Sequence, residues 1–140
     1  MRCEGWQRKL NEYILESQEK YKKTGLVFGE FDCCLYAANW VRLLTGIDPM
    51  EDYRGRYSSK DEAFDMLAEK EGTLLDALTA RFGQPVNIAK AMRGDIALSE
   101  NDQALGIFFT SGSSMKALLL GKNGFSLHSA KECDYAFRVE

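Results

Sequence analysis

Two adjacent thiols that follow an aspartate are the residues of this chain best suited to chemistry. In the stretch 28–41, Gly29 marks a turn, Asp32 is placed to cap a helix, and Cys33 begins that helix. Aspartate at an N-cap accepts a bond from an amide of the first turn, and the positive end of the helix dipole favours thiolate over thiol. The pattern predicts a nucleophile at Cys33, with Cys34 facing the packing. The alternative is that Cys33 only fills core, as free cysteines often do.

A cysteine nucleophile needs a proton acceptor that later protonates the leaving amine. The chain contains one histidine, His128, near the end of a predicted strand. In one interpretation, the strand order brings His128 close to Cys33, and His128 acts as the base. In the other, His128 is a part-exposed residue with no catalytic role. The distance between the Cys33 sulfur and the His128 ring decides between these two interpretations.

The elements that must position these residues begin with helices. Apolar residues at three- and four-residue steps predict helices over 6–23, 33–44, 62–71 and 73–82. The third is expected to be capped by Ser59 or Asp61. The second is apolar around much of its circumference, so we expect it to be buried.

The composition changes near Arg93, where strands replace helices. Five short segments with turn residues between them predict strands over 94–98, 104–109, 114–120, 124–128 and 135–139. The third and fourth, joined across Gly-Lys-Asn-Gly, form the clearest hairpin. Helices followed by an antiparallel meander predict an α+β fold. We expect a single domain over 1–140, because neither half could bury a core alone.

A short loop between the second and third predicted helices carries two aromatic and two basic residues, namely Tyr53, Arg54, Arg56 and Tyr57. As a solvated turn with two aromatic anchors, it needs no function. Alternatively, it is a specificity loop that borders a groove, in which case these four residues are candidate binding residues.

The overall composition excludes several classes of function. The chain has 140 residues and a net charge of −3, with 18 basic against 21 acidic residues and no long run of one sign. A nucleic-acid partner is therefore not expected. No stretch is long enough to span a bilayer, and the N-terminus lacks the apolar run of a signal peptide. We expect no membrane partner and a cytoplasmic protein as synthesised.

The four cysteines, Cys3, Cys33, Cys34 and Cys133, are expected to be free thiols in a reducing compartment. Without a CxxC pair and with one histidine, the sequence predicts no metal site. Nor does it predict a cofactor.

Several short motifs occur in an order that resembles a known family. An Asp-Cys step opens an apolar helix at 32–41, and a Thr-Gly-x-Asp-Pro sequence at 45–49 ends it. An Arg-Gly-Arg-Tyr loop follows at 54–57, an Arg-Gly-Asp sequence at 93–95 leads into the sheet, and a Cys-x-x-Ala-x-Arg-Val strand at 133–139 closes the order. A Phe-Asp-Cys step at 31–33, a Gly-Asp-Ile-Ala step at 94–97 and a Leu-Gly-Ile-Phe strand at 105–108 resemble the NlpC-type papain-like hydrolases, which cleave amide bonds in bacterial cell-wall peptides. The five motifs above resemble more closely a group of uncharacterised phage and prophage proteins related to that fold. The resemblance implies a papain-like domain with N-terminal helices packed on a small antiparallel sheet.

The resemblance carries over only part of a catalytic site. Cys33 falls where the hydrolases keep their nucleophile, and Asp32 where they keep the preceding residue. Their general-base histidine precedes a Val-Gly-Ile-Tyr strand, and Ala104 stands at that position here. Their third polar residue would fall near Lys116 or Ala117, and neither orients an imidazole.

The resemblance therefore leaves alternative functions open. The first is a degenerate or non-standard relative with a tail-associated or binding role, whose partner is a peptidoglycan peptide or a phage tail protein and which is associated with the virion. The second is an active cysteine hydrolase of cell-wall peptide amides that uses Cys33 and His128. The third is an inhibitor or immunity-type protein that uses the cleft corresponding to the hydrolase active site as an interface.

Overall fold

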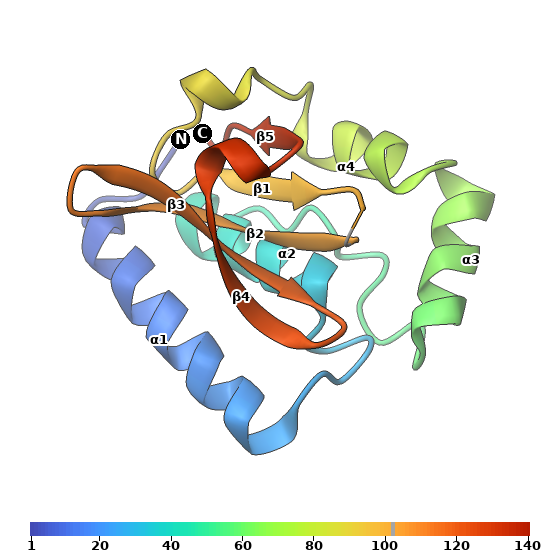
Figure 1. Cartoon of the computed structure of the whole chain (residues 1–140). Coiled ribbons are helices and arrows are strands. Elements are labelled where there is room, and N and C mark those ends of the chain that lie inside the picture. Colours follow the sequence, from blue (N-terminus) through green and yellow to red (C-terminus); the bar gives the residue numbers. More distant parts are fainter. Residues whose placement is uncertain (102) are drawn as a thin grey trace.

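The computed structural model describes residues 1–101 and 103–140, in which helices precede a single sheet (Figure 1). The α-helices are α1 (Trp6–Thr24), α2 (Cys33–Thr45), α3 (Lys60–Lys70) and α4 (Leu74–Phe82). The last three begin where a side chain accepts a hydrogen bond from a first-turn amide, and the capping residues are Asp32, Ser59 and Thr73. The four predicted helices are confirmed, and Ser59 rather than Asp61 is the cap of α3.

The second half of the chain forms the sheet. Its strands are β1 (Ile96–Ser99), β2 (Ala104–Ser111), β3 (Ser114–Gly121), β4 (Gly124–Ser129) and β5 (Tyr135–Phe137). They lie in the order β4-β3-β2-β1-β5, and every neighbouring pair is antiparallel. The expected α+β class and the β3–β4 hairpin are confirmed.

The position of β5 corrects the expected meander. After β4 a short 3-10 turn, η2 (Ala130–Glu132), leads the chain back to the opposite edge of the sheet, where β5 pairs with β1. The amide of Asp134 bonds the Leu98 carbonyl at 3.0 Å and starts this pairing. All four residues of β1 are buried, so β1 requires a partner on both edges to satisfy its backbone groups.

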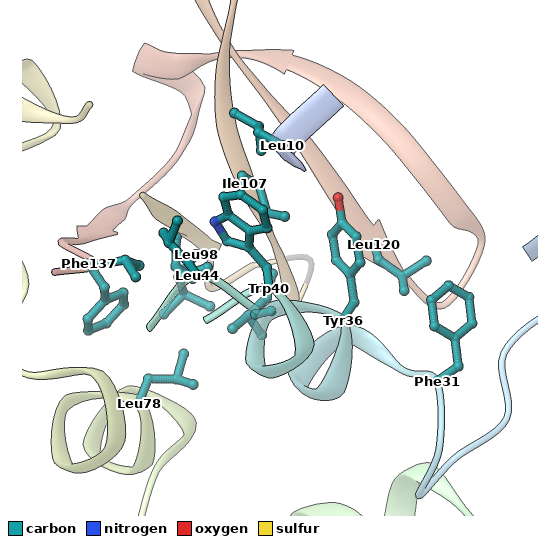
Figure 2. Packing of buried hydrophobic residues seen from close by; sticks show 14 residues of the cluster. Leu10, Phe31, Tyr36, Trp40, Leu44, Leu78, Leu98, Ile107, Leu120 and Phe137 are labelled. Atoms are coloured by element: carbon teal, nitrogen blue, oxygen red, sulfur yellow. The ribbon is translucent and has the colours of Figure 1, made fainter. Parts of the chain in front are cut away.

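The two faces of the sheet are covered by different parts of the chain. Leu105 and Ile107 belong to the main core, together with residues of α1, α2 and α4. Figure 2 shows Tyr36 and Trp40 of α2 packed in this core. The alternate residue Phe108 faces the other side, in a smaller core that includes residues of 86–91 and η2. Successive residues of β2 thus point to opposite faces of the sheet, and residues paired with them on neighbouring strands point to the same face as their partners.

The two ends of the chain lie side by side (Figure 1), and Arg2 links them through a hydrogen bond to Val139. Its guanidinium donates to the Val139 carbonyl at 2.8 Å, to the Arg93 carbonyl at 2.7 Å and to the Asp95 carboxylate at 2.8 Å. Asp95 is fully buried and also accepts from the amides of Met92 and Val139. The buried carboxylate therefore links the first residues, the entry to β1 and the end of the chain.

Among the described helices, none has both the length and the apolar character that crossing a bilayer requires.

Candidate functional site

Asp32 is the centre of the bonds that shape the start of α2. One carboxylate oxygen accepts from the Leu35 amide at 3.0 Å, and the other accepts from the Gly29 amide at 3.0 Å and the Tyr57 hydroxyl at 2.6 Å. The residue is 2% exposed. Burial and the neighbouring Asp32 carboxylate raise the pKa of Tyr57, so its hydroxyl remains a donor. Asp32 therefore holds two loops against the helix.

Gly29 allows these two loops to approach. Its φ is +92°, and a Cβ added there would lie 2.3 Å from the Tyr57 carbonyl oxygen. The Gly55 amide also donates to the Gly29 carbonyl at 2.9 Å. Only glycine fits this backbone contact, which fixes the position of Tyr57 over the helix terminus.

Cys33 and Cys34 are free, half-buried thiols whose sulfurs lie 4.0 Å apart. Its hydrogen bond with Cys33 and burial both raise the pKa of Cys34 well above its ordinary value. Cys34 also packs against the apolar cores on both sides of α2. The Cys34 thiol therefore stays protonated at neutral pH and serves packing, as the sequence predicts.

A small cavity opens over the two thiols. It lies between the start of α2, one side of α3 and the ends of the β1–β2 and β3–β4 connections. Most of its walls are apolar or aromatic, and two lysines, a glutamine and an aspartate add polar groups. The lining residues are Leu26, Phe28, Asp32, Cys33, Cys34, Tyr57, Lys60, Ala63, Phe64, Leu67, Gln103, Gly121 and Lys122. We call this cavity the thiol pocket.

His128 lines a second, larger hollow, together with Ala104 and Ser126. The thiol pocket and this hollow share four lining residues, Lys60, Gln103, Gly121 and Lys122. His128 pairs with Ala117, whose side chain belongs to the core on the face of the sheet away from α2. Directly paired residues point to the same face, so the His128 ring lies on that face.

Both ring nitrogens of His128 have partners other than Cys33. Nε2 lies 2.8 Å from the Ser126 hydroxyl, and Nδ1 lies 3.2 Å from the Glu132 carboxylate. Cys33 and His128 thus occupy neighbouring cavities rather than one site. Ala104, at the position of the resembling family's base, lies in the hollow next to the thiol pocket.

The loop residues Tyr53, Arg54, Arg56 and Tyr57 do not act as one group. Tyr57 lines the thiol pocket. Tyr53 is 2% exposed, with the guanidinium of Arg81 over its ring. Arg54 forms a two-bond ion pair with Asp48, and Arg56 is exposed. The solvated-turn interpretation therefore fits three of these residues, and the groove interpretation fits Tyr57.

Arg81 stabilises the same loop from α4 and gives it a measurable pH dependence. Its two hydrogen bonds to Asp52 lower the pKa of that carboxyl from its ordinary 3.8. A carboxyl with a lowered folded-state pKa adds stability above its unfolded pKa and loses it as the pH falls through the folded value. We expect the stability advantage of wild type over Arg81→Met to shrink below pH 3.8.

Urea unfolding at neutral pH and at pH about 3 measures this difference. Arg56→Met removes an exposed arginine of the same loop and serves as the control. If the stability difference between wild type and Arg81→Met were the same at both pH values, the ion pair with Asp52 would not be the source of the pH dependence.

Sequence reasoning missed several residues that line the two cavities. Phe64 and Lys60 of α3 line the thiol pocket, and a helical pattern alone does not say which neighbour a helix covers. Ser126 and His128 share one face of β4 by the two-residue period of a strand, so their proximity was readable from the sequence. Glu132 contacts His128 because the turn η2 after β4 brings it back beside the ring, and a strand pattern does not predict this turn.

No group of three or more His, Cys, Asp or Glu side chains arranged to hold a metal ion occurs within 1–101 and 103–140. The two lysines and the helix terminus instead supply positive charge beside the thiol pocket.

The fold and the site define an α+β domain in which a capped, buried helix presents two thiols to an apolar pocket. The chain belongs to the family described as Domain of unknown function (DUF6950), which matches residues 1–139. No curated protein and no solved structure matches the chain.

Proposed function

We propose that the protein is a binding module with a papain-like, NlpC-type fold, a degenerate relative of the cell-wall peptide hydrolases from a phage or prophage. In this proposal the thiol pocket binds a cell-wall peptide without cleaving it, as part of a tail-associated assembly. The observation that carries the proposal is the composition of the pocket. The described residues that line it include both thiols but no histidine.

Three features support binding over cleavage. The proton acceptor that acyl transfer requires is replaced by the methyl group of Ala104 in the adjoining hollow. The nitrogens of His128 are engaged by Ser126 and Glu132. The Asp32 carboxylate is occupied by three donors and is not free to orient a base.

The lining of the pocket favours a small apolar group that carries a negative charge. Phe28, Phe64 and Leu67 supply apolar walls, and the two cations of Lys60 and Lys122 outweigh the one carboxylate, that of the buried Asp32. A short peptide that ends in small side chains and a free carboxylate matches this combination. Cell-wall stem peptides belong to this chemical class.

Calorimetric titration with soluble cell-wall stem peptides tests the proposal. We expect saturable binding to wild type, and a loss of at least about tenfold in affinity for Ala63→Trp, which fills a pocket-lining position. Ala80→Trp places the same side chain at an exposed position of α4 and should bind as wild type. Equal binding by Ala63→Trp, or no binding by wild type, would overturn the proposal.

A second candidate, a cysteine hydrolase of cell-wall peptide amides, is favoured by one observation. Cys33 lines the pocket in the first turn of α2. Mass spectrometry of the titrated peptides tests it. Cleavage that is lost in both Cys33→Ala and His128→Ala would establish this candidate, and cleavage that survives His128→Ala would eliminate His128 as its base.

A further inference from the structure

Ser126, His128 and Glu132 form a chain of hydrogen bonds outside the thiol pocket. The Ser126 Oγ lies 2.8 Å from His128 Nε2, and His128 Nδ1 lies 3.2 Å from a Glu132 oxygen. The other Glu132 oxygen accepts from the Ser129 hydroxyl at 2.9 Å and the Ser129 amide at 3.3 Å. The carboxylate is thus fixed from one side while it holds the imidazole from the other.

The chemistry of these groups determines where the protons lie. An ionised carboxylate only accepts hydrogen bonds, so the Nδ1 that faces Glu132 must carry a proton. In the neutral ring Nε2 is then an acceptor, and the Ser126 hydroxyl donates to it. This is the tautomer and the atom order of a serine hydrolase triad, in which Nε2 faces the nucleophile and Nδ1 faces the carboxylate.

The strand and the turn after it produce this arrangement. Ser126 and His128 are two residues apart on β4 and therefore project from the same face. Their partners across the ladder, Leu119 and Ala117, both belong to the core on that face. The turn η2 then brings Glu132 back beside the ring.

The site is open to a ligand. Ser126 is exposed, and the His128 side chain is 25% exposed. Both line the larger hollow. Gly121, Gly124 and Ala104 leave room in it, and the remaining polar lining comes from Lys60, Asn101, Gln103, Lys122 and Asn123. These side chains suit an alcohol with several hydroxyl groups, and Lys122 and Asn123 carry N–H groups that can stabilise a carbonyl oxyanion.

We propose that Ser126, His128 and Glu132 form a second site, which hydrolyses short-chain carboxylic esters of polar, polyhydroxylated alcohols. Ser126 Oγ attacks the carbonyl carbon while its proton moves to His128 Nε2. The ester C–O bond breaks, and the departing alcohol takes that proton. Water then attacks the acylated serine and gives a proton to Nε2, the carboxylic acid leaves, and the proton returns to Ser126. Ser126 and His128 are the catalytic residues, and Glu132 is a positioning residue.

A fluorophosphonate probe and 4-nitrophenyl acetate test the site in the full chain. We expect the probe to label wild type, with the modified peptide mapping to Ser126, and Ser126→Ala and His128→Ala to lose the label. Ester turnover should fall at least about tenfold in Ser126→Ala. Because the cysteines are the same in both proteins, any reaction of the ester with thiols is common to both and does not affect the comparison.

Ser111→Ala, which removes an exposed serine at the end of β2, should label and turn over as wild type. Glu132→Gln should lower kcat with little change in KM, because it weakens the orientation of the ring and leaves the hollow intact. His128→Ala retains the serine, so its loss of label at an unchanged melting temperature identifies the imidazole as the activating group. Absence of label on wild type, or equal ester turnover in Ser126→Ala, would overturn the proposal.

Discussion

Replacing Asp32 with alanine is expected to lower the free energy of unfolding by about 3 kcal/mol. The substitution removes the cap of α2 and leaves the Gly29 amide and the buried Tyr57 hydroxyl without their acceptor. Both loops over the thiol pocket then lose their attachment. Chemical denaturation followed by tryptophan fluorescence measures the stability, and the rate of iodoacetamide labelling of Cys33 should rise in parallel.

Two milder variants separate the parts of this effect. Asp32→Asn retains an oxygen that can cap the helix, and Tyr57→Phe removes a single hydrogen bond to the carboxylate. Each is expected to destabilise by about 1 kcal/mol. If Asp32→Ala destabilised no more than Tyr57→Phe, the carboxylate would not organise the site.

The second large effect is expected where Arg2 meets Asp95. Arg2→Ala removes the closer of the two cations paired with the fully buried Asp95 carboxylate and leaves Arg138 at 3.7 Å. The expected loss is up to about 3–5 kcal/mol, the cost when a buried pair loses one partner. Asp95→Ala removes the anion paired with the Arg2 guanidinium and the side-chain acceptor of the Met92 and Val139 amides. The double variant should lose less free energy of unfolding than the two single variants together, because it removes both the guanidinium and the carboxylate. Thermal and urea unfolding of the four proteins complete the double-mutant cycle.

The exposed pair of Lys22 and Glu19 on α1 is the matched control for this cycle. Its side chains are 72% and 64% exposed, so removing either is expected to change stability by less than about 0.5 kcal/mol. Additive losses at Arg2 and Asp95 would show that the two residues act independently.

Local signals explain why the helices and most strands were predictable. Asp32, Ser59 and Thr73 each cap the helix that follows them, and a cap depends only on residues within one turn. The β3–β4 hairpin was likewise predicted from its turn residues. The α+β class follows from these elements and is confirmed by the structure.

The partner of β5 could not be obtained in the same way. The two-residue period of a strand gives its faces but not its neighbour, and η2 changes the edge to which the chain returns. The environment of His128 depended on the same turn. The sequence placed His128 on a strand, whereas its contacts with Ser126 and Glu132 follow from the fold around it. The proposed catalytic pairing of Cys33 with His128 remains a prediction that activity measurements address.

The pairing of β1 with β5 also affects when the protein can fold during synthesis. β1 leaves the ribosome long before residues 135–137, yet these residues supply its second partner. Until residues 135–137 emerge, one edge of the apolar strand β1 has no partner. Its free backbone groups can then pair with strands of other chains and start aggregation. Contacts between such distant segments also slow folding. The sheet is therefore completed only after residues 135–137 have been synthesised, and β1 keeps one unpaired edge until then.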